Sequence, residues 1–98
     1  MVAREASMKF LVNGTLRSNR SRAELLSPVR TRLLSDAAAA LVRDGVVSEH
    51  GFKTGERPGF VLIMESDSEK AVRSTVTFFP LVQDGWFDLE IDPVTPFP

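Results

Sequence analysis

The chain lacks cysteine altogether and has a single histidine and a single tryptophan. Without cysteine, the sequence excludes disulfides, thiolate catalysis and cysteine-ligated zinc or iron–sulfur sites. One histidine with no companion histidine or cysteine also argues against a transition-metal site. We therefore expect no metal centre.

An excess of charge of either sign is missing as well. The 12 lysine and arginine residues are nearly balanced by 13 aspartate and glutamate residues, which gives a net charge of −1. Nucleic-acid-binding proteins normally present a basic face. The one basic cluster, residues 17–22, has no interleaved aromatic residues. We expect no nucleic-acid partner.

Long apolar runs are also absent. No stretch approaches the ~18–20 apolar residues that span a bilayer, and residues 1–7 lack the apolar stretch of a secretory signal. We expect no membrane partner and a cytoplasmic location.

The overall composition is typical of one small soluble domain, since 43% of the 98 residues are apolar and 26% are charged. We interpret residues 1–7 as a flexible leader, 8–92 as the domain and 93–98 as an extended C-terminal arm, because its prolines exclude a helix. A chain of this size buries only about 60–65% of its unfolded surface, so association with a second copy would stabilise it.

The first half of the domain reads as a strand followed by a helix. Residues 8–16 alternate between apolar and mixed positions, as a half-buried strand does. Ser21 and Glu24 have capping-box spacing, and Asp44-Gly45 fits a helix end. Pro28 leaves two alternatives, a helix that starts at Ser27 or one that starts at Ser21 and is kinked near Pro28, and we favour the second. The expected buried stripe is Leu26, Val29, Leu33, Ala37 and Leu41.

The second half reads as two strands, a helix and a last strand. Residues 46–53 and 60–65 flank a Gly- and Pro-containing hairpin loop. Ser66 and Glu69 predict the cap of a helix that ends at Pro80 and buries Val72, Val76 and Phe79. In residues 86–92, Phe87, Leu89 and Ile91 alternate with Trp86, Asp88, Glu90 and Asp92.

This order of elements predicts the α+β ferredoxin-like fold, βαββαβ, in which both helices cover one face of a four-stranded antiparallel sheet. The other face would carry Leu11, Trp86 and half of the FVLIM strand, an apolar area too large to leave in water. A second copy packed face to face would bury it in a barrel. Asn13, Asp88 and Glu90 are expected on the same face, and a half-apolar cavity with a few polar groups is typical of a small-molecule site.

Four segments resemble the muconolactone isomerase-like members of the dimeric α/β-barrel superfamily. They are the opening strand MKFLVNGTL, the long first helix ending in DG, the GFKTG hairpin entry and the FFPL…WFDLEI block. The resemblance implies a homodimer, or a ring of dimers. It also implies a cofactor-free isomerase that transfers a proton on a small cyclic carbonyl or lactone substrate. Polyketide cyclases, cofactor-free monooxygenases and haem-degrading enzymes share the superfamily, so these activities and a non-catalytic ligand-binding barrel stay open.

Isomerisation by proton transfer needs a base and a donor for the enolate oxygen. We expect Glu90 to be the base, with Asp88 as the acid beside it and Asn13 as the donor. His50 is either an acid or base at the cavity or an exposed residue of an edge strand. Lys9 is a candidate for binding a substrate carboxylate, as is Arg17. Leu11 and Trp86 are expected to line the ligand cavity.

Overall fold

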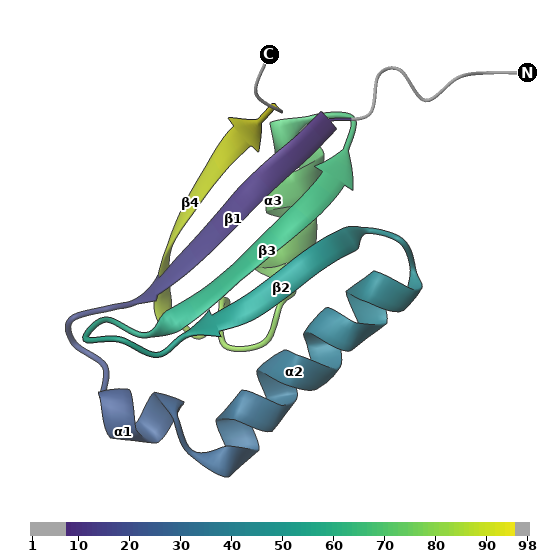
Figure 1. Ribbon diagram of the computed structural model, residues 1–98. Coiled ribbons are helices and arrows are strands. Elements are labelled where there is room, and N and C mark those ends of the chain that lie inside the picture. The colour runs from purple at the N-terminus through teal and green to yellow at the C-terminus, as the bar shows by residue number, and fades with distance from the viewer. Residues whose placement is uncertain (1–7, 96–98) are drawn as a thin grey trace, which may run out of the picture.

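The computed structural model describes residues 8–95, which form one four-stranded antiparallel sheet with strand order β2-β3-β1-β4 (Figure 1). The elements in chain order are β1 (Met8–Leu16), α1 (Arg22–Leu25), α2 (Pro28–Arg43), β2 (Val47–Lys53), β3 (Gly59–Ser66), α3 (Glu69–Thr77) and β4 (Phe87–Val94). This is the ferredoxin-like α+β fold, and the prediction from the sequence is confirmed. None of the helices in residues 8–95 is long and apolar enough to cross a membrane.

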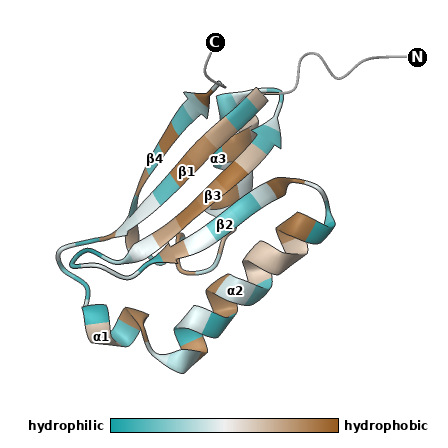
Figure 2. Cartoon of the chain, viewed as in Figure 1, coloured by the Kyte–Doolittle hydropathy of each residue, from teal (hydrophilic) through white to brown (hydrophobic). Residues whose placement is uncertain are grey.

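The core lies between the sheet and the helices, and strand alternation supplies most of it (Figure 2). Every second residue of the two central strands is buried under α2 and α3, as a period of two requires. The buried apolar residues of the strands are Phe10, Val12, Leu16, Val47, Phe60, Leu62, Met64, Phe87 and Ile91. Val72, Val76 and Phe79 face them from α3 and the segment after it, as predicted.

The first helix is not one kinked helix, and that prediction is wrong. Ser21 caps the short α1, because its Oγ accepts a hydrogen bond from the Glu24 N–H at 3.1 Å. Ser27 then adopts extended backbone and Pro28 starts α2. The proline has no N–H to continue α1 and disfavours helical backbone at the residue before it.

The predicted buried stripe of this helix is only partly correct, because Ala37 and Leu41 pack partly buried against the core whereas Val29 and Leu33 do not. Val29 and Leu33 are 72% and 47% exposed, whereas Leu34 and Ala38 are buried. The spacing of the predicted stripe was counted from Leu26, which lies before the break between α1 and α2 at Ser27. Because α2 starts anew at Pro28, its orientation is independent of that phase.

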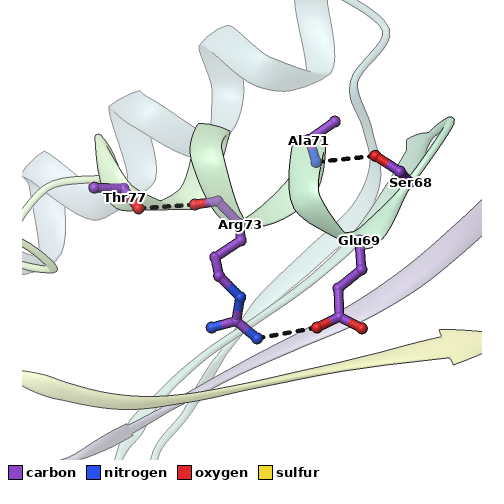
Figure 3. A network of polar contacts seen from close by, with 5 residues as sticks. All are labelled: Ser68, Glu69, Ala71, Arg73 and Thr77. Atoms are coloured by element: carbon purple, nitrogen blue, oxygen red, sulfur yellow. Dashed lines mark hydrogen bonds and ion pairs between the residues drawn. The ribbon is translucent and has the colours of Figure 1, made fainter.

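The cap of α3 is Ser68 rather than Ser66. The Ser68 Oγ accepts a hydrogen bond from the Ala71 N–H at 3.1 Å, and one turn later Arg73 pairs with Glu69 at 3.1 Å (Figure 3). Ser66 still pairs with Met8 and therefore ends β3. The predicted left-handed residue after α2 is confirmed, since Gly45 has φ of 77°.

Strand β4 runs past the predicted end of the domain. Pro93 and Val94 pair with Phe10 and Lys9 of β1, although the sequence placed them in the C-terminal arm. A proline is tolerated there because β4 is the outermost strand and needs no donor on its free side. The rest of the expected arm beyond residue 95, and the expected leader, lie outside the described residues.

Candidate functional site

The two faces of the sheet divide the predicted site residues into two groups. Lys9, Leu11 and Asn13 of β1 share the face that the helices leave open with Asp88 and Glu90 of β4, as the alternation predicted. In the ladder, Asn13 lies opposite Glu90. This open face also holds Thr15, Glu49, Lys53, Val61, Ile63, Glu65 and Asp92.

Lys53 lies at the centre of the polar half of the open face, and it was not among the predicted site residues. Its Nζ donates a hydrogen bond to the Thr15 Oγ1 at 2.7 Å. Thr15 and Lys53 are both ladder partners of Gly59, one on each neighbouring strand. Because Gly59 has no side chain, the lysine side chain passes over it to reach Thr15. Burial lowers the pKa of Lys53, and the nearby Arg57 lowers it further, while Glu90 opposes the shift.

The predicted acid–base residues of this face are exposed in the described chain. Glu90 is exposed, and the Asp88 Oδ1 lies 3.3 Å from the Arg17 Nε in a solvent-exposed ion pair. The Oδ1 of Asn13 is different. It is buried yet has no hydrogen-bond partner among residues 8–95. A buried polar atom of this kind normally accepts a hydrogen bond.

Trp86 does not lie on the open face, and that expectation is wrong. It belongs to the core and is only 5% exposed, and the guanidinium groups of Arg20 and Arg30 lie 4.6 and 4.8 Å from the centre of its ring. Trp86 lies between the turn at Gly85, which has φ of 77°, and Phe87, the first residue of β4. The alternation of strand residues between the two faces therefore does not extend to Trp86.

His50 lies on the opposite face from Glu90 and Asp88. Its ladder partner is Leu62, whose side chain is buried under the helices, so the imidazole is on the helix-covered side. A β-bulge between Val47 and Glu49 resets the alternation of β2 there. The predicted edge position of this strand is confirmed, and His50 is exposed.

His50 borders a cavity of about 190 Å³ between α2 and strands β2 and β3. For comparison, an apolar cavity of about 150 Å³ accommodates benzene, so this one has room for a single ring. It is lined by Leu34, Ser35, Ala38, His50, Gly51, Phe52, Phe60, Leu62 and Phe79. Within residues 8–95, the only polar side chains of the lining are His50 and Ser35.

Two other hollows offer less chemistry. His50 also borders a depression of about 230 Å³ on the open face, where Glu49 is the other titratable residue and the rest of the lining is apolar. A wider groove of about 400 Å³ runs between α2 and the end of α3, and none of its described lining residues is titratable. The cavity with His50 and Ser35 on facing elements is therefore the best candidate site. Ser35 and Lys53 were not among the residues predicted from the sequence.

Comparison with known proteins identifies the fold. No family model matches the chain, and no curated protein matches it in sequence. Among solved structures, it is similar to the 5-chloro-2-hydroxyhydroquinone dehydrochlorinase of Burkholderia phenoliruptrix AC1100, solved in complex with 2,5-dihydroxybenzoquinone. The TM-score is 0.64 at 22% sequence identity, over 90% of this chain and 94% of that one. The two chains thus share the fold over almost their whole lengths.

Proposed function

We propose that this protein is a cofactor-independent enzyme that moves a proton on a small, single-ring carbonyl compound such as an unsaturated lactone. The observation that carries the proposal is the ring-sized cavity, apolar apart from Ser35, with His50 at its rim. Apolar pockets with a few convergent polar groups are the usual form of a small-molecule site. The dehydrochlorinase with the same fold, which was solved with a one-ring quinone, supports a ligand of this size.

The chemistry needs one group that both removes and returns a proton. Histidine is suited to this because an imidazole ordinarily changes its charge near neutral pH. In the proposed reaction, neutral His50 takes the proton from the carbon next to the ring carbonyl, and the C–H electron pair forms an enolate. The imidazolium, whose N–H exchanges with solvent, then gives a proton to the far end of the double bond. The product is an isomer of the substrate, so the reaction is balanced without any co-reactant.

The direct test uses α-angelica lactone, a neutral unsaturated lactone, in deuterated buffer followed by NMR. We expect the protein to speed its isomerisation with deuterium incorporation, and His50→Gln to lose roughly 100-fold or more of this rate, the usual share of a general base. The matched control is Glu90→Gln, which removes a carboxylate from the other face. A loss in Glu90→Gln with none in His50→Gln would move the chemistry to the open face and overturn the role of His50. Ligand binding without any exchange would make the protein a binding module.

We also propose that a second copy of the chain covers the open face. Leu11, Val61 and Ile63 form an apolar strip there that is only partly buried. The unpartnered Oδ1 of Asn13 lies beside this strip in the ladder. A second sheet would exclude water from the apolar strip and could supply the missing donor. In this arrangement, Lys9, Asp88 and Glu90 belong to the interface region rather than to the His50 cavity.

A further inference from the structure

The lining of the His50 cavity carries no fixed positive charge. Among the described residues, no lysine or arginine borders it. The basic residues of α2 and β2 lie outside this lining, Arg43 at the last position of α2 among them. Arg30 lies over Trp86, Arg32 is exposed and faces Asp36 at 4.0 Å, and Lys53 is bound to Thr15 on the other face of the sheet. A carboxylate in this cavity would find no cation except a protonated His50.

A carboxylate held against this apolar lining would lose part of its hydration without gaining a counter-ion, which disfavours it. His50 cannot fill this role in the proposed reaction, since it must be neutral in order to accept the proton. The cavity is therefore electrostatically matched to an uncharged ligand.

Ser35 of α2 gives the cavity its second polar group. Ser35 is on α2 and His50 on β2, and both are exposed residues that border the cavity. A serine hydroxyl is a donor that also accepts, which suits a neutral carbonyl oxygen and offers no charge to a carboxylate. Aromatic rings of Phe52, Phe60 and Phe79 line the space between them.

We infer that the cavity selects neutral single-ring carbonyl or hydroxyl compounds and rejects rings of the same size that bear a carboxylate, with Ser35 as a ligand-binding residue. This inference rests on the proposed function, and it narrows the substrate class. The resemblance noted in the sequence points to lactones such as muconolactone, which carry a carboxymethyl group. The lining of this chain disfavours that group.

The test compares two probes of one ring size, neutral para-cresol and anionic para-hydroxybenzoate, by amide-shift NMR at a pH where His50 is neutral. We expect para-cresol to shift the amides of the cavity lining and to bind at least 10-fold more tightly. Ser35→Arg should place a cation at the rim and reduce this preference at least 10-fold. Ser35→Gln is the matched control for side-chain length without charge, and should leave the preference in place.

The outcomes separate the two proposals. If para-hydroxybenzoate binds the wild-type cavity as tightly as para-cresol does, the selectivity is overturned while the proposed site survives. If neither probe shifts the cavity amides and α-angelica lactone is not turned over, the site itself is overturned. If Ser35→Gln abolishes the preference as fully as Ser35→Arg, charge is not the cause and the inference fails.

Discussion

The ring of Phe60 occupies the space that a side chain at Gly14 would need. A Cβ atom at Gly14 would lie 2.4 Å from the Phe60 Cε2, well inside van der Waals contact. The two residues are ladder partners on β1 and β3. The ring also packs against Phe79 and Phe87, with centroids 5.0 and 4.9 Å away. Gly14 therefore sets the position of a ring that lines the His50 cavity.

We predict that Gly14→Ala lowers the free energy of unfolding by about 1–3 kcal/mol, the usual cost of overpacking a core. The measurement is urea unfolding followed by the fluorescence of Trp86. Gly51→Ala is the matched control on a strand, because its Cβ would meet Val61 at an ordinary 3.9 Å. Equal stability of the two variants would show that the Phe60 ring can move aside.

The lowered pKa of Lys53 predicts a pH dependence of stability. In the unfolded chain the amine titrates near its ordinary value of 10.5, whereas the folded chain releases the proton at lower pH. Between the two values the unfolded state binds more protons, so the free energy of unfolding rises with pH across this window. Below the window, burial of the charged amine opposes folding to its full extent.

Lys53→Met should remove this rise, and Lys70→Met, at an exposed helix position, should keep it. The measurement is the unfolding free energy of wild type and both variants at pH 8 and above pH 10.5. A wild-type curve parallel to that of Lys53→Met would contradict the prediction. The absence of tyrosine in the sequence removes the other side chain that commonly titrates in this range.

Arg20 and Arg30 lie close to the ring of Trp86, so we predict that their positive charges stabilise the fold through contact with that ring. Arg30→Met keeps most of the apolar stem but loses the cation, and we expect it to cost about 0.5–2 kcal/mol. Arg32→Met, from a side chain that is 83% exposed, should change stability by less than about 0.5 kcal/mol. Thermal and urea unfolding of both variants would check this, and a larger effect at Arg32 would refute it.

The proposed second copy predicts a self-associated protein at micromolar concentration. Ile63→Asp places a charge on the open face and should dissociate the assembly. Leu33→Asp makes the same change on α2, at a residue that is 47% exposed, and should leave it intact. Sedimentation velocity distinguishes these states. A stable wild-type monomer of 10.8 kDa would rule out the proposal.

The sequence predicted the strands and their faces well, because alternation in a strand is set by neighbouring residues alone. Its errors lie where the chain changes direction. The helix phase failed because the break at Ser27 resets it, and Trp86 was misplaced because the Gly85 turn separates it from β4. The face on which the first residues of β2 lie depends on the β-bulge between Val47 and Glu49, and that bulge has no sequence signature of its own.

The candidate site was only partly predictable for a related reason. His50 was identified from its chemistry, and the edge position of its strand was predicted correctly. Ser35 could not be connected with it, because that contact depends on how α2 packs against β2. Such packing joins residues distant in the sequence, and the helix phase that would have revealed it was lost at Pro28.

The alternation of β2 has an evolutionary consequence. Glu49 and His50 are neighbours in the chain, yet they face opposite sides of the sheet, one toward the proposed partner and one toward the proposed substrate. Selection for assembly and selection for substrate can therefore act on alternate codons of the same strand. Among relatives of this protein, we expect odd and even positions from Glu49 to Lys53, beyond the bulge, to diverge at different rates.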